Sequence, residues 1–183
     1  MLNKNMNKQE IEEFLNTKGN FMQIDYLKRF LNESPPLDKR KFALLKLTEV
    51  YEKLGMCREC AQMFHNLAMI SITFADKIQC HIKEAEICIR GGFFDLADKA
   101  MNKAMSEANS RQKKEVYDEV VRAYKEQASI YEAEVKRNSA TRIYEKLLSM
   151  NLSDLEKQEI RGKLIYLYER LGKFKEARFM EGL

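Results

Sequence analysis

The sequence contains no tryptophan and, among its 183 residues, only two prolines and seven glycines. Proline and glycine mark the turns that separate short strands, so their scarcity argues against a fold of many strands and favours long helices. Only four cysteines and two histidines occur. The cysteines lie within helical patterns rather than in a loop-rich disulfide framework, which predicts a reduced, cytoplasmic protein.

Long hydrophobic runs are missing as well. The longest mostly apolar stretch, Leu67 to Ala75, is interrupted by Ser71 and Thr73 and is far shorter than the about 18 apolar residues of a membrane span. The segment from Met1 to Lys8 has no apolar core of the kind found in signal peptides. We therefore expect no membrane span.

A strong excess of charge of one sign is also absent. The chain has 32 basic and 28 acidic residues, a net charge of +4, and the two signs interleave along the sequence. A nucleic-acid-binding protein more often shows a basic stripe on one face or one segment. The charge pattern therefore argues against nucleic acid as a partner.

Apolar residues at helical spacing are what the sequence does contain. Phe42, Leu45, Val50 and Leu54, for example, recur at the period of a helix rather than of a strand. The predicted helices span about residues 7–15, 21–31, 38–54, 73–90, 94–109, 111–135, 138–150, 153–171 and 174–180, with one more after Gly55. Asn7 and Ser153 are predicted N-caps, the latter in a capping box with Glu156.

A five-residue phrase occurs twice, and its register reveals a repeat. Tyr51-Glu-Lys-Leu-Gly55 returns as Tyr168-Glu-Arg-Leu-Gly172. Two weaker copies lie between them, so that corresponding residues fall 37, 43 and 37 positions apart. Three sets of positions share this register: Tyr51, Cys88, Tyr131 and Tyr168; the helix breaks at Gly55, Gly92, Val135 and Gly172; and the small residues Cys60, Ala97, Ala140 and Ala177. A period of this length is typical of stacked helical units.

The turn phrases resemble those of the tetratricopeptide repeat family. The segment from Tyr168 to Ala177 is similar to the turn between the two helices of that family's repeat, and so are Gly92 to Ala97 and Gly55 to Cys60. The units are longer than the family's usual period of about 34 residues, and the third has Val135 in place of the turn glycine.

This resemblance implies an all-α fold, a right-handed α-α superhelix built as a TPR-like solenoid of antiparallel helix pairs. An N-terminal helical unit would occupy residues 1–36, and a repeat array residues 37–183. Its units would span about residues 41–72, 73–110, 111–152 and 153–183. The longer units are also similar to those of SNAP-type vesicle adaptors and clathrin-like solenoids.

The resemblance also implies where a partner binds. In such arrays the first helices of the pairs line a concave face that holds peptides. Here that face would carry Leu45, Glu49, Glu52, Ile82, Glu86, Ile89, Arg122, Lys125, Ser129, Glu132, Tyr166, Glu169 and Arg170. Ile82 and Ile89 would form an apolar strip on it, unless they pack against adjacent helices instead. The expected function is an interaction scaffold for a partner peptide or helix, with a trafficking or coat adaptor as the alternative.

A metal-binding protein is the alternative from another class. Cys57 and Cys60 form a CxxC pair, and His65, Cys80, His81 and Cys88 follow nearby. A zinc-containing regulatory domain would need four such groups to converge. The repeat register instead assigns Cys60 and Cys88 to buried packing positions, where cysteine acts as a small apolar residue. We therefore expect no metal and no cofactor.

Motifs of catalysis are missing from the sequence. Neither histidine falls in an HExxH motif, and no GxSxG, phosphate-binding glycine loop or dinucleotide fingerprint occurs. Glu84 and Glu86 are two residues apart and face different sides of a helix, so they are not expected to act as a pair. We predict that the protein is not an enzyme.

The sequence leaves open how the C-terminal end of the repeat array is covered. The last predicted helix is short and shows no polar capping helix after it, whereas the end of a solenoid normally needs a polar outer face. Self-association through the C-terminal helix, a longer parent chain, or a fourth unit that caps the array by itself would each account for this.

Overall fold

The computed structural model describes residues 2–182, and within them it contains ten helices and no strand. The helices are α1 (Lys8–Asn16), α2 (Asn20–Asn32), α3 (Leu37–Lys53), α4 (Cys57–Met69), α5 (Phe74–Arg90), α6 (Phe94–Glu107), α7 (Ser110–Ala133), α8 (Arg137–Leu148), α9 (Asp154–Arg170) and α10 (Phe174–Glu181). This confirms the prediction of an all-helical fold, and the helix boundaries agree with the predicted ones to within a few residues.

Two helices begin where the sequence predicts a cap. The side chain of Asn7 accepts a hydrogen bond from the Glu10 backbone N–H at 3.0 Å, and Glu10 accepts one from the Asn7 backbone N–H at 2.8 Å. Ser153 and Glu156 form the same reciprocal capping box at the start of α9. Each box provides acceptors for N–H groups that have no partner within the helix.

Four helix ends share one turn structure. Gly55, Gly92 and Gly172 have φ values of +68°, +74° and +72°, and Val135 has +58°. In each turn the next residue donates its backbone N–H to the carbonyl five positions earlier, from Met56 to Tyr51, Phe93 to Cys88, Lys136 to Tyr131 and Lys173 to Tyr168, at 2.8–2.9 Å. This is the Schellman pattern, in which a left-handed residue ends the helix and satisfies its last carbonyls. The repeat spacing found in the sequence therefore corresponds to four turns of the same type.

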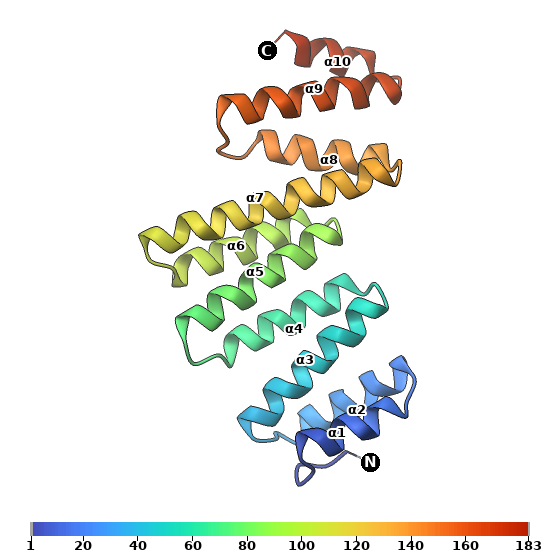
Figure 1. The fold of residues 1–183 in the computed structure, drawn as a ribbon, viewed down its shortest axis with the longest axis vertical. Coiled ribbons are helices and arrows are strands. Elements are labelled where there is room, and N and C mark those ends of the chain that lie inside the picture. Colours follow the sequence, from blue (N-terminus) through green and yellow to red (C-terminus); the bar gives the residue numbers. More distant parts are fainter. Residues whose placement is uncertain (1, 183) are drawn as a thin grey trace. The chain divides into compact units, whose positions relative to one another are not determined.

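The chain divides into two compact units, one ending at Tyr117 and the other starting at Asp118, within α7. In the first unit α2 packs on α3, α3 on α4, α4 on α5 and α5 on α6; in the second, α9 packs on both α8 and α10 (Figure 1). Neighbouring helices thus pack in the order of the sequence. A division into compact units does not locate the ends of repeats. The predicted boundaries of the N-terminal unit and of the four repeats therefore stay predictions.

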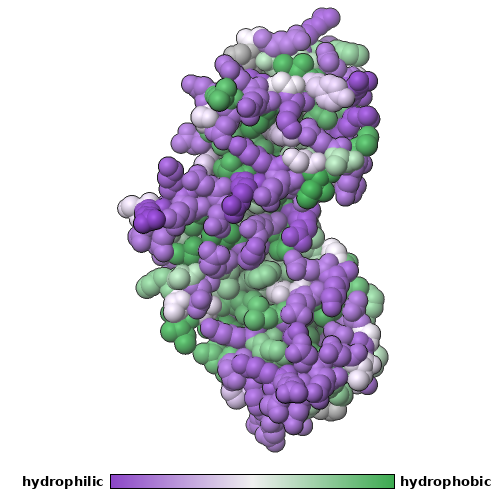
Figure 2. Space-filling view, viewed as in Figure 1, coloured by the Kyte–Doolittle hydropathy of each residue, from purple (hydrophilic) through white to green (hydrophobic). Residues whose placement is uncertain are grey.

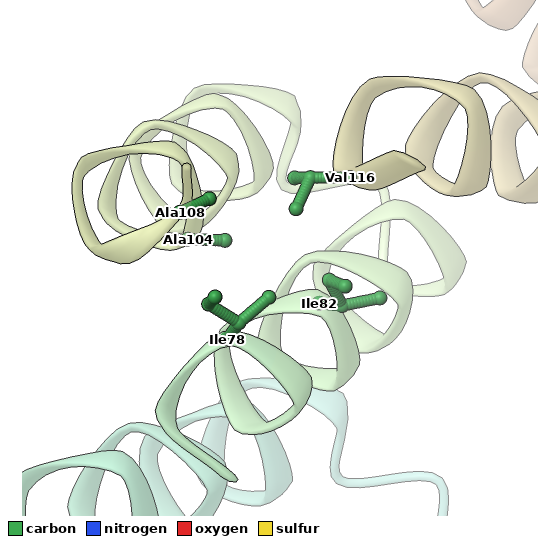
Figure 3. Close-up of a cluster of buried hydrophobic side chains, with 5 residues drawn as sticks. All are labelled: Ile78, Ile82, Ala104, Ala108 and Val116. Carbon is green, nitrogen blue, oxygen red and sulfur yellow. The ribbon is translucent and has the colours of Figure 1, made fainter. Parts of the chain in front are cut away.

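Small residues lie where consecutive helices approach each other. Cys60, Ala97, Ala140 and Ala177 are all at most 4% exposed. Figure 3 shows a related cluster in the first unit, where Ile78 and Ile82 of α5 face Ala104 and Ala108 at the end of α6 and Val116 of α7. Alanines on one helix give room for the branched side chains of the other, and truncating such a buried isoleucine to alanine costs about 2–5 kcal/mol.

The face drawn in Figure 2 is mostly polar. Figure 2 shows hydrophilic residues over much of the visible face, with hydrophobic residues between them in patches. Among the helices of residues 2–182, none has both the length and the apolar character needed to cross a bilayer.

Candidate functional site

The exposed side of α3 carries three of the residues predicted for a binding face. Leu45, Glu49 and Glu52 follow one another at intervals of about one helical turn. All three are exposed, and Leu45 retains 47% of its accessible surface although it is apolar. Ala43, Leu44 and Leu47 on the other side of the same helix are buried. These three side chains therefore lie at the surface, and their role in binding a partner stays a prediction.

The predicted apolar strip on α5 is not at the surface. Ile82 is 2% exposed and Ile89 is 1% exposed, because α5 is covered by α4 on one side and by α6 on the other. The expectation that these two side chains face a ligand is wrong, and the alternative that they pack against adjacent helices is correct. The exposed stripe of α5 is polar and runs through Gln79, Lys83, Glu86 and Arg90, of which Glu86 is half-buried.

Ion pairs connect the exposed stripes of alternate helices in the first unit. Arg90 Nη1 of α5 lies 3.3 Å from Glu52 Oε1 of α3. Lys46 of α3 reaches Glu12 of α1 at 2.6 Å and also contacts Glu49 at 3.1 Å. These two carboxylates raise the pKa of Lys46, the hydrogen bond to Glu12 having the largest effect. The stripes of α1, α3 and α5 are thus linked to one another by side chains that bridge the helices.

The second unit repeats this relationship between α7 and α9. Lys125 of α7 lies 2.6 Å from Glu156, and Lys163 of α9 lies 3.0 Å from Glu132. Together with the Ser153 hydrogen bonds, Lys125 lowers the pKa of Glu156 to about 2. The predicted residues Arg122, Ser129, Tyr166, Glu169 and Arg170 are exposed nearby on the same two helices, and Tyr166 is 53% exposed with Arg170 over its ring.

The cysteines do not form a metal site in the described part of the chain. Cys60 and Cys88 are buried, and Cys57 and Cys80 are half-buried. Burial raises the pKa of Cys60 to about 12 and that of Cys88 to about 11. The Cys60 thiol lies 3.7 Å from the Thr48 carbonyl oxygen, to which it donates a weak hydrogen bond. These are the properties of packed, unreactive thiols, as the repeat register indicates.

A different polar cluster lies inside the first unit. His81 Nδ1 and Glu84 Oε2, both on α5, are 2.8 Å apart, and His65 Nδ1 of α4 is 3.4 Å from the same oxygen. Lys103 Nζ of α6 is 3.3 Å from Glu84 Oε1 and 3.1 Å from His65 Nδ1. Burial by itself would raise the pKa of Glu84, but the hydrogen bond with His81 and the charge of Lys103 hold it below its ordinary value. Glu84 is therefore a carboxylate at neutral pH.

This cluster opens into a pocket of about 460 Å³. Its walls come from α4, α5 and α6 and include His65, Glu84 and Lys103, together with Arg58, Ala61, Gln62, Cys88 and Leu96. His81 lies behind this wall with 7% of its side chain exposed, whereas Lys103 retains 43%. The pocket lining thus combines one buried carboxylate, Glu84, with the basic side chains of Arg58 and Lys103.

Sequence reasoning missed this cluster although a signal was present. His81 and Glu84 are three residues apart and therefore occupy one face of a helix. The zinc alternative drawn from the sequence grouped both histidines with the cysteines and left out Glu84, for which only a pairing with Glu86 was considered. His65 comes from another helix, so no local spacing could connect it with the pair.

No family model, curated protein or solved structure matches this chain. The class that the structure itself defines is an all-helical protein in which neighbouring helices pack in sequence order. Functional statements about it therefore depend on its own residues.

Proposed function

We propose that this protein is a non-enzymatic interaction scaffold, a TPR-like right-handed solenoid that holds a peptide or helix of a partner protein on the exposed face of its first helices. The observation that carries the proposal is the set of ion pairs between alternate helices: Glu12 with Lys46, Glu52 with Arg90, and Lys125 with Glu156. Helices connected in this way present their exposed stripes side by side, as a surface that receives an extended ligand requires.

The chemistry of this surface indicates the kind of partner. In the first unit it combines the exposed Leu45 with Glu49, Lys83 and Glu86, and in the second it combines Tyr166 with Arg122 and Glu169. A large apolar side chain that is exposed among charged residues often anchors a binding partner. A segment with an apolar anchor and charges of both signs fits the exposed stripes of either unit better than a purely apolar helix does.

The experiment compares partner capture by the wild-type chain and by surface variants. Leu45→Asp and Tyr166→Asp place a charge at each apolar anchor without touching the core, because both side chains are about half exposed. Asn102→Asp in α6 and Lys175→Asp in α10 are matched controls at exposed positions of second helices. We expect the anchor variants to lose partners that the controls retain, by at least tenfold in affinity. Anchor variants that fold normally and retain every partner would refute the proposal.

Two exposed phenylalanines favour self-association through the C-terminal helix. Phe174 is 61% exposed and Phe179 is 64% exposed, both on α10. Mass measurement by light scattering over a range of concentrations tests it: a Phe179→Asp variant is expected to stay monomeric where the wild-type chain associates. The vesicle-trafficking alternative stays a prediction that depends on repeat length alone.

A further inference from the structure

We propose that His65, His81 and Glu84 bind a divalent transition-metal ion, with Zn²⁺ as the best fit. One ligand atom can be chosen from each residue such that all three atoms lie within 4.8 Å of one another. Two imidazole nitrogens and one carboxylate oxygen form a common zinc donor set, which leaves a fourth position for water. This site is independent of the proposed binding face and uses none of its residues.

Two of the three distances between ligand residues, those to Glu84, are close to the distances of a tetrahedral site. Ligand bonds of about 2.0–2.1 Å place tetrahedral donor atoms roughly 3.3 Å apart. His65 Nδ1 and Glu84 Oε2 are already 3.4 Å apart. His81 Nδ1 and the same oxygen are 2.8 Å apart, a hydrogen-bond distance. A metal ion would displace the proton between them and separate them by about half an ångström.

The fold does not require polar residues at the helix positions that His81 and Glu84 occupy. Counted back from the left-handed residue of each turn, His81 and Glu84 correspond to Leu44 and Leu47 in α3. Leu44 is 4% exposed and Leu47 is 0% exposed, so in α3 both register positions pack well with leucine, whereas the corresponding positions of α7 and α9 include Gln127 and Arg161. Placing a histidine and a carboxylate there costs desolvation free energy that leucine avoids. A bound cation would compensate for that cost.

Lys103 completes the arrangement and also competes with the ion. Its contact with Glu84 Oε1 leaves Oε2 directed at the two histidines, as a residue that orients a metal ligand does. Its contact with His65 Nδ1, at 3.1 Å, occupies a nitrogen that the ion would need. Because 43% of the Lys103 side chain is exposed, the ammonium group can turn into the pocket and into water. The same pocket gives the ion a route of entry.

The test is titration of the full chain, freed of metal by a chelator, with Zn²⁺ alone and with Co²⁺ alone. We expect one ion per chain in calorimetry. His65→Ala and Glu84→Gln should each weaken Zn²⁺ binding at least tenfold, with Cys57→Ser as a control that leaves it unchanged. The His65 side chain is partly exposed, so its variant is expected to fold, and circular dichroism checks this. Lys103→Met should bind about tenfold more tightly because a like charge close to the ion is removed.

The visible and near-ultraviolet spectrum of the Co²⁺ form distinguishes this site from a cysteine site. Two nitrogens and one oxygen give weak tetrahedral bands without thiolate-to-cobalt charge-transfer absorption. Such absorption would overturn the proposal, because it would place Cys88 or another thiol on the ion. Zn²⁺ binding that is equal in the wild-type chain, His65→Ala and Glu84→Gln would overturn it as well.

Discussion

Val135 holds, at φ +58°, the left-handed backbone conformation that Gly92 holds at φ +74° at the corresponding step of the previous repeat turn. The two turns make equivalent hydrogen bonds, from Lys136 N to the Tyr131 carbonyl and from Phe93 N to the Cys88 carbonyl, both at 2.8 Å. A β-branched residue is a strong outlier in this region. The turn geometry is therefore set by the helix pair, and valine adopts it under strain.

Val135→Gly is expected to stabilise the protein. Relief of the left-handed strain is worth roughly 1–2 kcal/mol, and the greater flexibility of glycine in the unfolded chain offsets about 0.5–1 kcal/mol of it. The net gain of about 0.5–1 kcal/mol should appear as a higher midpoint in urea denaturation. Gly92→Ala is the reciprocal control and should lower the midpoint, since no atom lies within 4 Å of the added Cβ and only the backbone is affected. A lower midpoint for Val135→Gly would contradict this assignment.

Gly91→Ala and Gly162→Ala should change stability in opposite directions. A Cβ on Gly91 would lie 2.8 Å from Cys57 Cβ and 2.7 Å from a ring carbon of Phe93. Gly162 is exposed within α9 and has open space around it, so alanine there should gain about 1 kcal/mol of helix stability. Thermal melts of the two variants test the pair. Equal shifts would show that the contact of Gly91 with α4 is unimportant.

The periodic pattern and the turn residues predicted this fold well. Tyr51, Gly55 and Cys60 define one turn and its packing contact by local chemistry alone, and the same spacing located the others. Val135 shows that the register can persist where the glycine is lost. The predicted superhelix depends on angles between helices, which a one-dimensional pattern does not contain.

The candidate site was predicted less well, for a physical reason. Leu45 and Ile82 stand at the same distance before the glycine that ends their helix, yet Leu45 is exposed and Ile82 is buried, because Ile82 packs in a cluster with Ala104, Ala108 and Val116. Burial of this kind depends on neighbouring helices. The His65 contact with Glu84 is likewise a contact between helices, which no spacing within either helix reveals.

The cysteines should differ in reactivity according to burial. Burial raises the pKa of Cys60 from its ordinary 9.0 to about 12, which lowers its thiolate fraction near neutral pH roughly a thousandfold. Cys88 is raised to about 11. Under native conditions iodoacetamide should label the half-buried Cys57 first, with Cys60 and Cys88 labelled only after unfolding, as measured by peptide mass spectrometry. Early labelling of Cys60 would show that its packing is not as described.

Acid should weaken the second unit through Glu156. Hydrogen bonds from Lys125 and Ser153 lower its pKa from 4.5 to about 2. A lowered folded-state pKa stabilises the protein above the ordinary value, and this stabilisation disappears as the pH falls from about 4.5 to about 2. The stability of Glu156→Gln, which can still form the capping box, should fall less steeply over that interval. Glu159→Gln, exposed on the same helix, should follow the wild-type curve in denaturation at each pH.

The central claim is that partners bind to the exposed stripes of the first helices, and site-specific photo-cross-linking tests it most directly. A photoreactive amino acid at Leu45 should cross-link a defined partner after irradiation, whereas the same amino acid at Asn102, exposed on α6, should not. Competition by unlabelled wild-type chain should abolish the Leu45 product. A partner cross-linked from Asn102 and not from Leu45 would place the binding surface on the second helices and contradict the account.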